Sequence, residues 1–274
     1  MSNFFIRTPL ESECYQLADT FTRSFMVPLD SIQQEELAQK FKAQIQNKVV
    51  FFLVAEENEQ MVGLGGESRY RGCSFIGWLG VNPHRRKLGI GSALFQRLLE
   101  QATVYNPTVE LFSNLGIENL YRRFGFEDQF HAHIFELSKQ TKVDNSDVKT
   151  VIDRIPQWIY ELDQRIMGFD RSVLLKLLIE TLGARLVYLE PDGYAIQANS
   201  NIGPLITKDV DVAKSLINQL LVTGSKRIIS PTEFESEFKK FSPKRVQTCL
   251  KMTYGRLLLS EVSWIWGFHS FATG

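Results

Sequence analysis

The apolar and polar positions of the first 138 residues predict a mixture of strands and helices. Apolar runs with strand character cover residues 4–7, 49–55, 61–70, 75–81, 109–112 and 130–137. Apolar residues at helical spacing predict helices over residues 10–25 and 32–45, after Gly91, and over 117–124. The predicted order is β-α-α-β-β-β-α-β-α-β, which indicates an α/β (α+β) fold.

A second unit follows a polar stretch that lacks apolar periodicity, KQTKVDNSDVK. We therefore predict a domain over 1–138, a linker over 139–150 and a second domain over 151–274. Residues 155–181 predict one or two helices interrupted near 168–171. Strands over 184–190 and 194–199 flank Pro191-Asp192-Gly193, which is a strong hairpin signal. The strand–turn–helix–strand order then returns at 202–206, 211–221 and 226–230.

Residues 76–102 combine a buried strand, a basic turn and an amphipathic helix. Pro83 ends the strand because it cannot donate a ladder hydrogen bond. Gly89 and Gly91 then open the helix. The first N–H groups of a helix lack internal partners and carry partial positive charge, and glycines allow a phosphate to approach them closely. The pattern therefore predicts an anion site, although a glycine-containing helix start on an ordinary surface is the alternative.

The residues of the turn distinguish between known kinds of phosphate-binding loop. A Walker loop is absent, and Leu94 stands where a dinucleotide fingerprint requires its third glycine. Arg86, Gly89 and Gly91 instead match the Arg/Gln-x-x-Gly-x-Gly/Ala loop of the GNAT acetyltransferase superfamily. A second GNAT signature is similar to residues 114–126, where the matching residues are Asn114, Leu120, Tyr121, Gly125 and Phe126, while Ile117 replaces the usual small residue.

This resemblance implies the GNAT fold, in which helices flank a mixed, splayed central sheet. It also implies acetyl-CoA as co-substrate. The backbone of Leu79, Gly80 and Val81 would pair with the pantetheine arm and polarise the acetyl carbonyl. Asn114 would lie where the two central strands splay apart. The residues expected to hold the pyrophosphate are Arg86, Lys87, Leu88, Gly89, Ile90, Gly91 and Ser92.

The resemblance also places a general acid at Tyr121, whose reference pKa lies above that of a thiol. The alternative is that Tyr121 is an amphipathic residue at a domain seam. Some family members place a carboxylate base on the strand of the first motif, but residues 73–81 contain none, so Glu67, one strand earlier, is the nearest candidate base. A surface glutamate, with water deprotonating the amine, is the competing interpretation.

The second unit resembles a GNAT-like domain without an intact cofactor loop, as in two-domain bacterial GNAT proteins of the YitH-like type. Its turn, residues 207–211, has no glycine and carries two carboxylates that would repel a pyrophosphate. Asp170 and Arg171 could form part of the acceptor pocket, or they could be an ion pair at a helix boundary.

Composition excludes several other classes of function. The 31 basic and 31 acidic side chains cancel, so we expect no nucleic-acid partner. No apolar run approaches the length of a membrane span, and no targeting segment is evident, so we expect a cytoplasmic protein without a membrane partner. Three widely spaced cysteines form no metal or disulfide framework, and His131 and His133 alone make a poor metal site.

The sequence thus predicts an acetyl-CoA-dependent N-acetyltransferase that forms a ternary complex with a small-molecule or peptide amine. A CoA-binding regulatory or sensor protein with little transferase activity is the alternative. The sequence does not identify the acceptor amine, and a homodimer is possible.

Overall fold

A computed structural model describes residues 4–138, 147–151 and 153–274. The chain folds into two compact units, Met1–Glu110 with Thr273 and Leu111–Ala272 with Gly274. This division falls within strand β5 (Thr108–Asn114), whereas the predicted domains separate at residues 139–150. Most of the predicted linker, residues 139–146, lies outside the described residues.

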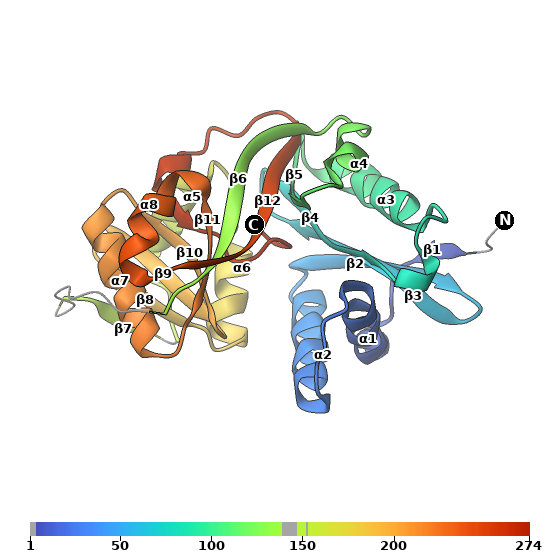
Figure 1. Cartoon of the computed structure of the whole chain (residues 1–274), viewed down its shortest axis with the longest axis horizontal. Coiled ribbons are helices and arrows are strands. Elements are labelled where there is room, and N and C mark those ends of the chain that lie inside the picture. Colours follow the sequence, from blue (N-terminus) through green and yellow to red (C-terminus); the bar gives the residue numbers. More distant parts are fainter. Residues whose placement is uncertain (1–3, 139–146, 152) are drawn as a thin grey trace. The chain divides into compact units, whose positions relative to one another are not determined.

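The first unit is an antiparallel sheet with helices on both faces (Figure 1). Its strand order is β1-β2-β3-β4, and the start of β5 is parallel to β4. Helices α1 and α2 lie on one face, and α3 lies on the other. The elements are β1 (Phe5–Arg7), α1 (Cys14–Phe25), α2 (Ser31–Gln46), β2 (Val50–Glu57), β3 (Gln60–Arg69), β4 (Ser74–Val81) and α3 (Ile90–Tyr105).

Helix α3 packs closely on β3 because glycines in that strand leave room for it. Ile90, Leu94 and Leu98 of α3 are buried. A Cβ atom on Gly65 would lie 2.6 Å from the Leu98 side chain. A larger residue at position 65 would therefore push the helix away from the sheet.

The second unit contains the rest of β5 and all later elements. Its strand order is β5-β12-β6-β11-β10-β9-β8-β7, with β13 paired to β10. The elements are α4 (Glu118–Arg122), β6 (Glu127–Glu136), β7 (Lys149–Val151), α5 (Gln157–Met167), α6 (Ser172–Lys176), a π-helical turn (Leu177–Thr181), β8 (Arg185–Leu189), β9 (Gly193–Ala198), β10 (Asn201–Thr207), α7 (Val210–Val222), β11 (Arg227–Pro231), α8 (Glu235–Phe238), β12 (Lys244–Gly255) and β13 (Ile265–Gly267).

The element order occurs twice along the chain. The first series is β1-α1-α2-β2-β3-β4-α3-β5-α4-β6, which is the order that the sequence predicts. The second series, β7-α5-α6-β8-β9-β10-α7-β11-α8-β12, is identical in element type, apart from short 3₁₀ and π turns. In both series three antiparallel strands precede a helix that leads to a parallel strand. We call the two series the first and second repeats.

The last strands of the two repeats are exchanged. Strand β12 of the second repeat lies between β5 and β6 of the first, and β6 lies between β12 and β11. The two strands are antiparallel, from Lys244 opposite Glu136 to Thr253 opposite Glu127. Figure 1 shows them as long neighbouring strands, β6 in green and β12 in red. This exchange places the end of the first repeat within the second compact unit.

Strand β12 is the main element that the sequence analysis did not predict. Its apolar positions Val246, Leu250 and Met252 fall on alternate residues with Thr248, and this is the period of a half-buried strand. None of the helices in the described part of the chain is both long and apolar enough to cross a membrane.

A buried histidine lies where β6 and β12 meet. Nδ1 of His133 lies 2.9 Å from Thr248 Oγ1, and Nε2 lies 3.4 Å from Nη1 of Arg245 and 3.8 Å from Oε2 of Glu235. Burial lowers the pKa of His133, and the charge of Arg245 lowers it further, while Glu235 acts in the opposite direction. The folded protein therefore favours the neutral imidazole.

We expect His133 to make the protein less stable in acid. Its stabilising contribution should be complete above the unfolded pKa of about 6.5 and be lost as pH falls through the lower folded pKa. Urea unfolding at several pH values should show the wild type losing more stability below about pH 6.5 than His133→Gln. Parallel pH curves for the two proteins would contradict this expectation.

Candidate functional site

The N-terminus of α3 is free of side-chain caps among the described residues. Its N-cap, Gly89, has φ +84°, a left-handed conformation that glycine adopts without strain. At Gly91 an added Cβ would meet only the Val81 side chain, at 3.5 Å, which is an ordinary contact. The protein's own packing therefore does not require glycine at position 91, and the uncapped N–H groups are approachable by an anion.

Two arginine side chains of the basic turn before α3 bind other parts of the protein. Arg86 donates from Nε to Val81 O at 3.1 Å and from Nη2 to Ser24 O at 2.7 Å, so its guanidinium joins β4 to the last turn of α1. Arg85 forms an ion pair with Glu57 at 2.6 Å. The sequence predicts that Arg86 holds pyrophosphate, and the structure uses its side chain to fix the loop.

Strand β4 carries a bulge just before the turn. Trp78 and Leu79 stand opposite the single residue Gly65, because Gly66 pairs with Gly77 and Leu64 with Gly80. Trp78 has φ +57°, a conformation that costs a non-glycine residue on the order of 1–3 kcal/mol. The bulge reorients the backbone of Leu79–Val81, the segment expected to bind an extended arm. On the other side of β4, the parallel pairing with β5 extends only over Ser74 and Phe75.

Glu67 is completely buried, so its interpretation as a surface glutamate is wrong. Its Oε1 accepts from Ser74 Oγ at 2.9 Å, and its Oε2 pairs with Arg69 Nη2 at 3.0 Å. The Arg69 guanidinium lies 3.9 Å from the centre of the Phe51 ring and 3.8 Å from that of Tyr105. Glu67 therefore belongs to a fixed network at the Ser74 end of β4.

Asn114 and Tyr121, predicted to be functional, lie at the end of β5 and on α4. Tyr121 is buried, and burial, together with the nearby Cys249, raises its pKa to about 12. Its hydroxyl therefore stays protonated near neutral pH. Asn114 Oδ1 accepts hydrogen bonds from Gln247 Nε2 at 2.7 Å and from Cys249 Sγ at 3.3 Å. Gln247 and Cys249 lie on β12 and were missed with that strand.

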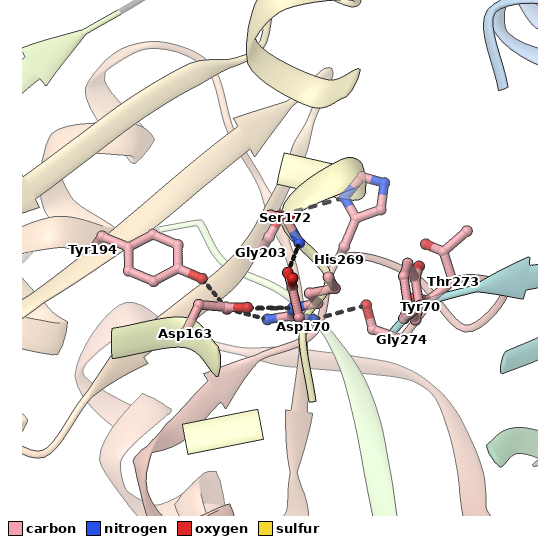
Figure 2. Close-up of polar contacts among 10 residues, drawn as sticks. Tyr70, Asp163, Asp170, Ser172, Tyr194, Gly203, His269, Thr273 and Gly274 are labelled. Atoms are coloured by element: carbon pink, nitrogen blue, oxygen red, sulfur yellow. Dashed lines mark hydrogen bonds and ion pairs between the residues drawn. The ribbon is translucent and has the colours of Figure 1, made fainter. Parts of the chain in front are cut away.

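Asp170 and Arg171 do not form a pair, because Arg171 binds Asp163. Figure 2 shows Asp170 beside the backbone N–H of Ser172, to which it is bound. Arg171 is 1% exposed and binds Asp163 at 2.8 Å, and its Nη1 donates to Gly274 O at 3.2 Å. Tyr194 donates to the same Asp163 carboxylate. Asp170 accepts from Ser172 N at 2.8 Å at the start of α6. Arg171 is thus part of a buried network, and the expected helix-boundary pair has Asp163 as its acidic partner.

In the second repeat the helix that corresponds to α3 caps itself. Oδ1 of Asp209 accepts from the N–H groups of Asp211, at 2.7 Å, and Val212, at 3.2 Å. The carboxylate occupies the donors that an external anion would need.

The space between strands β10 and β11 of that repeat is also occupied by another part of the chain. Strands β10 and β11 pair at Asn201–Arg227 and Ile202–Ile228. Beyond that point β13 pairs with β10, while Ile229 of β11 bridges to Phe268. Trp266 of β13 is buried and donates from Nε1 to Thr207 O at 3.1 Å. The chain's own C-terminal segment therefore lies between β10 and β11.

No group of three or more histidine, cysteine, aspartate or glutamate side chains in the described part of the chain could hold a metal ion. His84 and Arg85 line a small hollow of about 180 Å³ beside the turn. Its other lining residues are Glu57, Asn58, Gln60, Val62 and Asn82.

Two parts of the chain match family models. Residues 48–128 and residues 159–267 each match a model described as an acetyltransferase (GNAT) domain. The first match lies in the first repeat, and the second covers most of the second repeat and continues through β13.

Solved structures give a similar result. A proposed acetyltransferase from Pyrococcus horikoshii is 26% identical, with a TM-score of 0.93 over 100% of this chain and 97% of that one. A tandem GNAT protein from the clavulanic acid biosynthesis pathway has a TM-score of 0.61 at 12% identity, covering 92% of this chain and 98% of that one. A GCN5-related N-acetyltransferase from Sphaerobacter thermophilus has a TM-score of 0.61 at 10% identity, covering 94% and 97%. The last two show likeness of fold alone.

We expect Asp163→Asn to destabilise the protein strongly, by about 3–5 kcal/mol, because it leaves the Arg171 charge buried without its partner. Chemical denaturation measures this loss. Asp128→Asn is the matched control, since it breaks an exposed pair with Arg122 and should change stability far less. Equal losses in the two variants would show that the buried network is not structural.

Proposed function

Because this chain belongs to the GNAT acetyltransferase superfamily, with one GNAT domain in each repeat, we propose that it transfers an acetyl group from acetyl-CoA to an amine. The acceptor is a small-molecule or peptide amine that attacks the thioester directly in a ternary complex. The first repeat carries the cofactor loop, and the second repeat has no free equivalent of it.

The observation that most supports this proposal is the uncapped N-terminus of α3, the helix that follows the bulged strand β4. Gly89 and Gly91 leave the first N–H groups of the helix open to a pyrophosphate, and the arginine turn is held against β4 and α1. The residues present fit acetyl-CoA, since an anion needs these donors and the backbone of Leu79–Val81 can pair with an extended pantetheine arm.

Acetyl transfer needs a proton for the departing thiolate, and Tyr121 is suited to supply it. The amine nitrogen bonds to the acetyl carbon, the carbon–sulfur bond breaks, and the tyrosine O–H donates to the sulfur. With a pKa of about 12, Tyr121 is protonated at neutral pH. The ammonium form of the acceptor loses its proton to water, because Ser74 and Arg69 already hold the carboxylate of Glu67.

A CoA-binding sensor with little transferase activity is the second candidate. The self-capped α7 and the inserted β13 favour it for the second repeat, whose cofactor site is filled by the chain itself. They do not bear on the open loop of the first repeat, and therefore we favour the enzyme.

We expect Gly91→Glu to abolish stabilisation by acetyl-CoA. At about 100 times its dissociation constant, a ligand stabilises the native state by roughly 2.7 kcal/mol, which shifts the unfolding midpoint by a few degrees. A carboxylate at position 91 repels the pyrophosphate but suits the first turn of a helix, so the free variant should unfold near the wild-type temperature.

Val104→Glu is the matched control, because it places the same charge at an exposed position near the other end of α3. It should keep the full acetyl-CoA shift. A shift that survives in Gly91→Glu would mean that the ligand binds elsewhere, and the second repeat would be the first place to search.

We expect Tyr121→Phe to lower kcat by at least about 100-fold, the lower end of what general acid catalysis contributes, with little change in the Kd of acetyl-CoA. Thiol release measures kcat, and calorimetry measures Kd. Because the pKa of Tyr121 is about 12, wild-type kcat should not fall between about pH 7 and 10 through loss of this proton. Undiminished turnover in the phenylalanine variant would remove Tyr121 from the mechanism.

A further inference from the structure

A lysine of the first compact unit lies beside a tryptophan and has no acidic partner among the described residues. Lys40, on α2, places its Nζ atom 5.6 Å from the centre of the Trp78 ring. No ion pair or hydrogen bond joins this ammonium group to another residue in the described part of the chain. Burial lowers the pKa of Lys40, and no neighbouring carboxylate opposes this effect. The lysine charge is therefore partly removed from water without a protein group that balances it.

The indole N–H of Trp78 also lacks a partner. Its Nε1 atom is buried and has no hydrogen-bond acceptor among the described residues. The rings around it are those of Phe21, Phe41 and Phe52, at 5.6, 5.2 and 6.3 Å between ring centres. A Cβ atom on Gly66 would lie 2.9 Å from Cδ1 of Trp78, so the indole lies against β3. Buried N–H groups in folded proteins are paired with few exceptions, and this one indicates that water or a ligand supplies the acceptor.

The ammonium and the indole N–H together favour a ligand with a single negative charge. Both groups are donors, and neither can accept a hydrogen bond. The charge of Lys40 repels a cation, although the aromatic rings alone would attract one. A carboxylate balances one positive charge, whereas a phosphate dianion would leave excess negative charge among aromatic rings. A carboxylate therefore suits this place better than a cation or a phosphate.

The position of Trp78 in β4 connects these two donors with acetyl transfer. Trp78 lies in the bulge and directly precedes Leu79–Val81, the segment expected to pair with the pantetheine arm. Lys40, Trp78 and this segment all belong to the compact unit that contains Met1–Glu110. We propose that Lys40 Nζ and Trp78 Nε1 bind a carboxylate of the acceptor, so that the substrate is an amino carboxylate. This inference rests on the proposed function, and it names the substrate class of that reaction.

The test compares acceptors with and without a carboxylate. Each pair combines an amino acid with the amine that remains when its carboxylate is removed: phenylalanine with phenethylamine, and β-alanine with ethylamine. Thiol release from acetyl-CoA measures kcat/KM for each compound. We expect the carboxylate member of at least one pair to have a kcat/KM about tenfold higher or more, the effect of a hydrogen bond between charged groups.

Lys40→Met removes the ammonium group but keeps an unbranched apolar side chain beside Trp78. It should lower kcat/KM for the preferred carboxylate about tenfold, through KM, and change kcat/KM for its decarboxylated partner by less than about twofold. Its unfolding temperature should not fall, because the substitution removes a charge that no protein group balances.

Lys42→Met is the matched control, since it removes the same charge from the same helix at a lysine whose side chain is 44% exposed. It should keep the preference for the carboxylate. Calorimetry with the same compounds gives a second readout that does not require turnover, and Lys40→Met should raise the Kd of the preferred carboxylate about tenfold.

The two readouts separate failure of the carboxylate site from failure of the proposed function. If amines are acetylated without a preference for either carboxylate, or if the preference survives in Lys40→Met, the carboxylate site is overturned and the proposed function stands. If no compound is acetylated but Lys40→Met weakens the binding of a carboxylate, the carboxylate site stands and the transfer reaction is overturned. If the wild type binds neither carboxylate, the site is overturned.

Discussion

The antiparallel pairing of β6 with β12 is the interaction on which the arrangement of the second compact unit depends. Each strand ends one repeat, yet each lies beside a strand of the other: β12 beside β5, and β6 beside β11. The backbone donors and acceptors of both strands are satisfied only when both repeats are folded. This explains why the compact units do not follow the repeat boundary, since the end of the first repeat is part of the sheet of the second.

The two repeats have the same element order but differ at the N-terminus of the helix that connects their parallel strands. In the first, the helix that connects the two parallel strands has a glycine as its N-cap, and its first N–H groups have no side-chain cap among the described residues. In the second, Asp209 supplies a carboxylate to the corresponding N–H groups, and β13 fills the space beside β10. The same element order thus leaves one helix N-terminus without a side-chain cap and gives the other a cap from the chain's own carboxylate. A buried Trp266 then contributes to packing instead of leaving room for a ligand.

Local sequence predicted the secondary structure of the first repeat and the open helix start at Gly89. Apolar periodicity predicted the strands and helices of the first repeat, because each burial pattern is a property of consecutive residues. The Gly89–Gly91 turn could also be predicted from consecutive residues, since an open helix N-terminus depends on a few adjacent residues. The carboxylates of the turn over 207–211 likewise predicted a second repeat without an intact cofactor loop, and one of them, Asp209, caps the helix that follows.

Only the tertiary structure decided which distant side chains meet. Glu67 and Arg171 were assigned to chemistry as charged residues near motifs, but their partners, Arg69 with Ser74 and Asp163, are set by strand register and helix packing. Gln247 reaches Asn114 because β12 crosses into the first repeat, a pairing between residues 133 positions apart in the chain. No local pattern specifies such a pairing, because strand order depends on the burial of the whole sheet. The sequence by itself determined the glycine-containing helix start at Gly89, and the exchange of two strands decided which side chains surround Asn114.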